Sequence, residues 1–65
     1  MQVFSVQGMT CGHCSRAVTK AVQALDAQAQ VSVDLAGKQV SVESELTAQQ
    51  ILAAIREEGY EAQAL

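Results

Sequence analysis

Residues 30–43 read QVSVDLAGKQVSVE, and this stretch decides the fold. Apolar and polar residues alternate on both sides of a short segment, residues 36–38, that contains Gly37. Alternation with a period of two is typical of a strand with one buried face, and a glycine between two such runs is typical of a tight turn. The stretch therefore predicts a β-hairpin formed by residues 30–35 and 39–43, with Gly37 providing the backbone freedom of the turn.

An amphipathic segment lies on each side of this hairpin. Residues 14–25 predict a helix with helically spaced core residues Cys14, Val18, Ala21, Val22 and Leu25. After the hairpin, Thr47 and Gln50 have the spacing of a capping box, and Gly59 has the place of a glycine that ends a helix. The apolar stripe of this second predicted helix consists of Ala48, Ile51, Leu52 and Ile55.

Two outer segments complete the pattern. Residues 2–7 alternate as a first strand, with Phe4 and Val6 on one face, and residues 60–65 form a short last strand. The order is β-α-β-β-α-β, which is that of the ferredoxin-like split βαβ motif. The sequence therefore predicts an α+β sandwich in which two helices cover one face of a four-stranded antiparallel sheet. At this length we expect a single domain, residues 1–65.

The composition excludes several classes of function. The formal net charge is −3, which argues against nucleic acid as a partner because phosphate binding needs a positive surface. The opening residues, MQVFSVQGMT, have neither the basic region nor the apolar run of a signal peptide, and no segment suits membrane insertion. We expect a cytoplasmic protein, in which a structural disulfide would be unusual and thiols stay available.

The only two cysteines, Cys11 and Cys14, lie in GMTCGHCS, where the first strand gives way to the first helix. The N-terminus of a helix lowers the pKa of a thiol, and the thiolate is the form that binds metal. A structural zinc site takes four ligands, whereas soft ligands at low coordination number suit Cu(I). A C-x-x-C pair is also a redox motif in thioredoxin-like proteins, but this chain contains no proline, so metal binding is favoured.

These motifs are similar to those of a known family. GMTCGHC matches the G-M-x-C-x-x-C signature of heavy-metal-associated domains, and the likeness extends from FSVQGMTCGHC to IREEGYEA. The chain most resembles the free bacterial copper chaperones of the CopZ type. The resemblance implies a protein that is not an enzyme and that binds one Cu(I) through Cys11 and Cys14. It also implies transfer of the copper to a copper-transporting P-type ATPase by ligand exchange.

The resemblance assigns supporting roles around the cysteine pair. Met9 would point into the core beneath the loop without ligating the metal, and Thr10 would be a loop residue that helps to cap the helix. Gly12 would let the loop close around the ion. Tyr60 would shield the site, hydrogen-bond near a sulfur, or instead pack in the core under the second helix.

Three further residues lie beside the pair. His13 is expected to point to solvent, because neighbours along a helix do not face each other, and to bridge a second copper in a homodimer or tune metal release with pH. Arg16 and Lys20 share the exposed helix face, where they are either solvated or dock to an acidic partner domain.

Three rival functions stay open at this point. The chain could be a metal-binding domain detached from a P-type ATPase, although a start at Met1 and an end just after the last strand favour a complete chaperone. It could carry another soft metal, namely mercury, zinc or cadmium. From a different class, it could be a thiol–disulfide oxidoreductase, which a measured redox potential would distinguish from a metal carrier.

Overall fold

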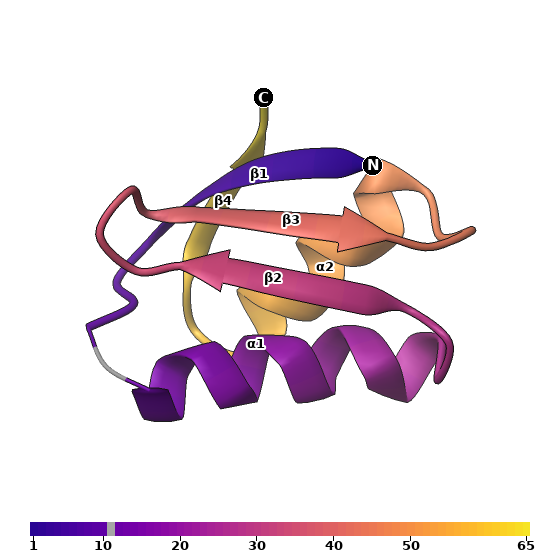
Figure 1. Ribbon diagram of the computed structural model, residues 1–65, viewed down its shortest axis with the longest axis horizontal. Coiled ribbons are helices and arrows are strands. Elements are labelled where there is room, and N and C mark those ends of the chain that lie inside the picture. The colour runs from indigo at the N-terminus through magenta and orange to yellow at the C-terminus, as the bar shows by residue number, and fades with distance from the viewer. Residues whose placement is uncertain (11) are drawn as a thin grey trace.

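A mixed sheet-and-helix sandwich is formed by the residues that this computed structural model describes, 1–10 and 12–65 (Figure 1). Its elements in chain order are β1 (Gln2–Gln7), α1 (Gly12–Leu25), β2 (Gln30–Asp34), β3 (Gln39–Glu43), α2 (Ala48–Glu57) and β4 (Glu61–Ala64). The strands lie in the order β2-β3-β1-β4, and every neighbouring pair is antiparallel. Both helices cover the same face of the sheet (Figure 1). The predicted ferredoxin-like α+β class is confirmed.

The hairpin forms as predicted, but its turn works differently. The left-handed residue is Lys38, with φ 56°, so the prediction that Gly37 supplies the backbone freedom was wrong. A Cβ at Gly37 would lie 2.5 Å from Oδ2 of Asp34, so a larger residue there would displace this exposed carboxylate. The Asp34 carboxylate folds over the turn and accepts the Gly37 N–H at 2.9 Å. Because β2 ends at Asp34, Leu35 lies in the turn and is exposed rather than facing the core.

The core lies between the sheet and the helices. Its fully buried side chains are Phe4, Val6, Val18, Val22, Val40, Val42, Ile51 and Ile55. Leu25, which the periodicity predicts to be buried, is 56% exposed, so that prediction was wrong. Leu25 is the last residue of α1, and the short side chains of Ala53 and Ala54 on α2 do not extend across to cover it.

Both ends of α2 are set by local sequence. Oγ1 of Thr47 accepts the Gln50 N–H at 3.2 Å, and the Gln50 side chain accepts the Thr47 N–H at 2.9 Å. This reciprocal pair satisfies helix N–H groups that have no partner within the helix, and it confirms the predicted capping box. At the other end, Gly59 has φ 94° and donates its N–H to the Arg56 carbonyl at 2.9 Å. The predicted glycine stop is also confirmed.

Three connections meet at one end of the sheet, and this end carries the site. The β1–α1 connection, residues 8–11, contains the segment that the sequence predicts to bind metal and is named the metal loop for that prediction. The preceding residue, Gln7, pairs with Glu61 at the start of β4, which brings the α2–β4 connection alongside. Val6 donates its N–H to the Lys38 carbonyl at 2.9 Å, which brings the β2–β3 turn to the same end.

Candidate metal centre

Cys14 lies in the first turn of α1. The helix begins at Gly12, two residues earlier than predicted, so Cys14 is its third residue. Its side chain is half-buried and packs against the core. The first turn of a helix presents N–H groups without helical partners and the positive end of the helix dipole, and both stabilise a thiolate. The predicted second ligand, Cys11, lies outside the described residues.

Thr10 lies beside the Cys14 sulfur. Its Oγ1 is 4.0 Å from Sγ of Cys14, and either atom can be the donor of this hydrogen bond. When Cys14 is a thiolate it can only accept, so the Thr10 hydroxyl then donates. The sequence prediction gave Thr10 a capping role, and this contact with the sulfur was not foreseen. No sequence pattern indicated this contact, because Thr10 precedes α1 and the rule that residues four apart are neighbours applies within a helix.

Met9 and Gly8 shape the start of the metal loop. Met9 is 6% exposed and belongs to the core cluster, so its side chain packs in the core. Gly8 has φ 98°, a backbone conformation that L side chains rarely adopt. The chain therefore leaves β1 through a turn that only glycine takes without strain, and buries the next side chain.

Tyr60 covers this turn from the α2–β4 connection. A Cβ built on Gly8 would lie 3.3 Å from Cδ1 of Tyr60, so the aromatic ring lies directly against the Gly8 backbone. The same ring is half-buried and packs against the core cluster. The packing against the core matches one of the predicted roles of Tyr60. The ring also contacts Gly8 in the metal loop, whereas the shielding of the site or a hydrogen bond near a sulfur stays a prediction.

Gly12 and His13 form the exposed start of α1. Gly12 is helical, and a Cβ built on it would meet nothing within 4 Å, so no close approach there requires a glycine. His13 is exposed and lines a surface hollow together with Arg16 and Lys20. The described residues include no group of three or more His, Cys, Asp or Glu side chains placed to hold a metal ion.

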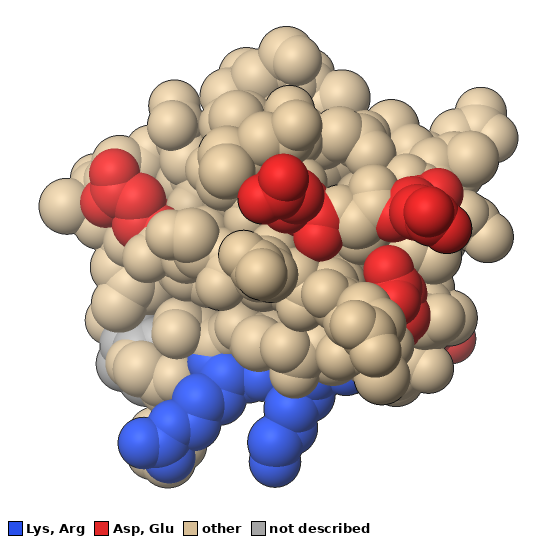
Figure 2. Space-filling view, turned by 45° about the vertical axis from the view of Figure 1, so that its right-hand side comes forward, with Lys and Arg blue, Asp and Glu red and all other residues tan. Residues whose placement is uncertain are grey.

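Two of the four basic side chains lie together on α1. Figure 2 shows lysine and arginine side chains together along the part of the surface formed by α1, with acidic side chains spread over the rest of this view. The basic residues of α1 are Arg16 and Lys20, both exposed. A positive stripe therefore lies beside the metal loop on a chain whose net charge is −3.

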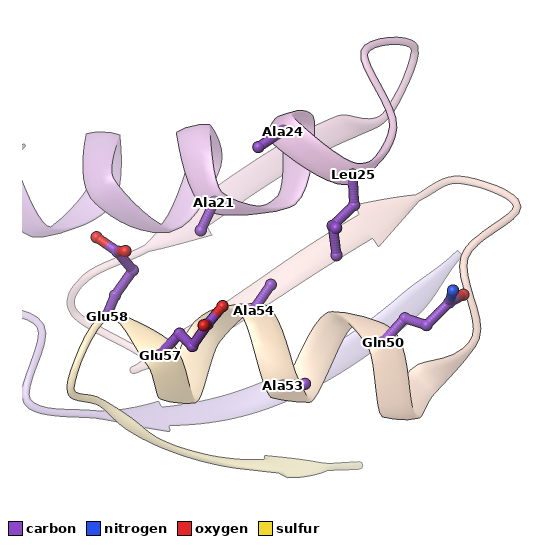
Figure 3. A pocket seen from close by; sticks show the side chains of 8 residues that line it. All are labelled: Ala21, Ala24, Leu25, Gln50, Ala53, Ala54, Glu57 and Glu58. Atoms are coloured by element: carbon purple, nitrogen blue, oxygen red, sulfur yellow. The ribbon is translucent and has the colours of Figure 1, made fainter.

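A groove of about 390 Å³ runs between α1 and α2 (Figure 3). Its lining residues are Ala21, Ala24, Leu25, Gln50, Ala53, Ala54, Glu57 and Glu58. The many alanines leave the space open, since their side chains are too short to fill it. Glu58 also lines the hollow that contains His13, so the groove leads from the far end of the helix pair toward the metal loop.

Comparison with known proteins agrees with this geometry. Residues 3–61 match the heavy-metal-associated domain, and the chain belongs to that family. It is 36% identical over 63 residues to the copper chaperone CopZ of Staphylococcus aureus, covering 92% of this chain and 93% of the relative. The solved copper chaperone Atx1 from Synechocystis superposes with a TM-score of 0.91 at 44% identity, covering 94% of this chain and 97% of the other.

The same fold occurs in a copper-binding domain of the P-type ATPase HMA7. It superposes with a TM-score of 0.84 at 28% identity, covering 100% of this chain and 95% of the other. The predicted family and its likeness to bacterial copper chaperones are thus confirmed, and this copper-chaperone-like domain is also related to ATPase domains. Among the described residues, neither helix is long and apolar enough to cross a membrane.

Proposed function

We propose that this chain, as one domain over residues 1–65, is a cytoplasmic copper chaperone and not an enzyme. It binds one Cu(I) through the thiolates of Cys11 and Cys14. The observation that carries the proposal is the placement of Cys14 in the first turn of α1, with the Thr10 hydroxyl 4.0 Å from its sulfur. The likeness to CopZ and Atx1, which are named as copper chaperones, supports the same metal.

Transfer proceeds by exchange of thiolate ligands. A partner thiolate forms a new bond to the copper, giving a three-coordinate complex, and one bond to Cys11 or Cys14 then breaks. A second exchange completes the transfer, and the copper stays Cu(I) throughout. The chain's part is to stabilise the thiolates when the metal leaves, through the N-terminus of α1 and the Thr10 hydroxyl.

The recipient is a copper-transporting P-type ATPase with an acidic docking face. Arg16 and Lys20 form the positive stripe beside the metal loop (Figure 2). Opposite charge on a partner speeds the encounter more than it tightens the complex. The related domain of a P-type ATPase supports this class of partner. The exposed His13 is proposed to face the partner or to bridge a second copper in a homodimer.

A second candidate is a metal-binding domain of an ATPase itself. The likeness to the domain of HMA7, which extends over the whole of this chain, favours it. The two candidates share the same metal and the same cysteine pair. They differ in whether the domain acts as a free carrier. A transfer assay with a separately expressed ATPase domain distinguishes them, because a free carrier delivers copper to that domain at a high rate.

The first test is an anaerobic titration of the reduced protein with Cu(I) against a chromogenic Cu(I) chelator, read beside native mass spectrometry. We expect one copper per chain, loss of binding in Cys11→Ser and Cys14→Ser, and weaker binding of Zn(II). A protein with intact thiols that cannot compete with the chelator would contradict the proposal. Preferred binding of mercury, cadmium or zinc would then favour a carrier of that metal, and rapid disulfide exchange would favour an oxidoreductase.

A further inference from the structure

Arg56 joins α2 to the edge of the sheet. It lies in the last turn of α2, and its Nη2 donates a hydrogen bond to the Ala62 carbonyl in β4 at 2.9 Å. The chain between these two residues, 57–61, contains Tyr60. The bond therefore closes this connection into a small ring, because one end is fixed by the helix and the other by the guanidinium.

The Ala62 carbonyl is available because β4 is an edge strand. Val6 directs its N–H toward the β2–β3 turn, on the other side of β1 from β4. Leu65 donates its N–H to the Val3 carbonyl, so the odd-numbered residues of β1 make the backbone hydrogen bonds to β4. In an antiparallel ladder such pairs alternate, and the Val6–Ala62 pair is therefore a non-hydrogen-bonded one. The Ala62 carbonyl points away from β1, where Arg56 satisfies it.

A surface hollow lies beside the connection. It has a volume of about 360 Å³ and is lined by Arg56, Tyr60, Glu61, Ala62 and Gln63. The Arg56 side chain crosses from α2 to β4 at this hollow, on the outer side of the Tyr60 connection. On the inner side, the Tyr60 ring lies against Gly8 at the start of the metal loop.

We propose that Arg56 is a positioning residue for the metal loop. By tying α2 to β4, it holds the Tyr60 ring over Gly8 and slows the release of bound Cu(I). The hydrogen bond of Arg56 goes to β4 and not to the described residues of the metal loop, 8–10, so its effect on the loop runs through Tyr60. The inference rests on the proposed copper site for its effect on release, whereas the clamp itself is a property of the metal-free protein.

The chain offers a clean probe, because Tyr60 is its only tyrosine and it has no tryptophan. Quenching of tyrosine fluorescence by acrylamide in the metal-free protein therefore reports on Tyr60 alone. The second readout is the rate at which the copper-loaded protein loses Cu(I) to an excess of chelator. The test variants are Arg56→Gln, which removes the charge, and Arg56→Lys, which keeps it.

Two control variants distinguish the positioning effect of Arg56 from a general loss of stability and from the loss of a positive charge. Thr47→Ala removes the capping box at the opposite end of α2 and lowers stability without touching Tyr60. Lys38→Gln removes an equal charge at the same end of the molecule, from an exposed side chain. Both are measured at temperatures where every variant is folded.

We expect Arg56→Gln to raise the quenching of Tyr60 above both controls and to speed copper release by up to about fivefold, the limit reached if the whole hydrogen bond is lost at the step of release. Arg56→Lys should fall between this variant and the original protein. Quenching and release in Arg56→Gln that match Thr47→Ala would overturn the inference. A protein that binds no copper would refute the proposed function, yet the quenching comparison would still decide whether the clamp exists.

Discussion

Replacement of Gly8 by alanine tests how the metal loop leaves the sheet. Gly8 has φ 98°, and a sparsely populated backbone conformation costs an L residue about 1–3 kcal/mol. Alanine also reduces the conformational entropy of the unfolded chain, which offsets this cost by about 0.4–1 kcal/mol. The new Cβ would lie 3.3 Å from the Tyr60 ring, so the half-buried ring must shift by a few tenths of an ångström. We therefore expect a net loss of up to about 2.6 kcal/mol in the free energy of unfolding, with mid-range values giving about 1.3 kcal/mol before the shift of the ring is added.

The matched control is Gly12→Ala in the same loop–helix junction. Gly12 is helical and a Cβ there meets nothing within 4 Å, so alanine should stabilise the metal-free protein by up to about 1 kcal/mol. Thermal unfolding followed by circular dichroism measures both. For a domain of this size 1 kcal/mol shifts Tm by about 4–8 °C, so the two variants should move in opposite directions. A Gly8→Ala protein as stable as the original would refute the left-handed turn and the contact with Tyr60.

Three further predictions concern other parts of the molecule. Lys38→Gly should stabilise the protein by about 0.5–1 kcal/mol in urea unfolding, because φ 56° strains a residue with a Cβ; a loss would contradict this. Met9→Leu should cost less than about 1.5 kcal/mol and leave Cu(I) affinity unchanged, whereas weakened affinity would make the thioether a ligand. Arg16→Glu with Lys20→Glu should slow copper transfer to an acidic ATPase domain in stopped-flow assays at low salt, while Cu(I) affinity stays the same; equal rates would exclude this stripe as the docking face.

The features that the sequence predicts well depend on short separations along the chain. The alternation in residues 2–7 and 39–43 matches the bounds of β1 and β3, because each run has one buried face. The capping box of Thr47 and Gln50 is likewise a local exchange of hydrogen bonds. Each of these features is encoded within about three to six consecutive residues, so the sequence alone is enough to predict it. The fold class then follows from the order of the predicted strands and helices.

The predictions that failed depend on tertiary contacts with residues of other elements. Periodicity places Leu25 on the apolar face of α1, but it carries no information on whether α2 has a side chain long enough to cover it. The position of Gly37 between two strands is typical of a flexible turn residue. The structure shows instead that the Asp34 carboxylate lies over Gly37 and occupies the space that a side chain would need. Arg56 receives no role from the sequence pattern, and only the tertiary structure connects it with Ala62.

The βαββαβ order gives the metal loop a support that the cysteine motif lacks. Because β4 pairs with β1, the connection from α2 is brought beside the connection from β1, and Tyr60 meets Gly8. Met9 of the metal loop belongs to the core cluster, and Tyr60 packs against the same cluster. The start of the loop is therefore held both by the core and by the second half of the chain, through one aromatic ring. Two cysteines at the right spacing do not encode this support, because it depends on which strand pairs with β1.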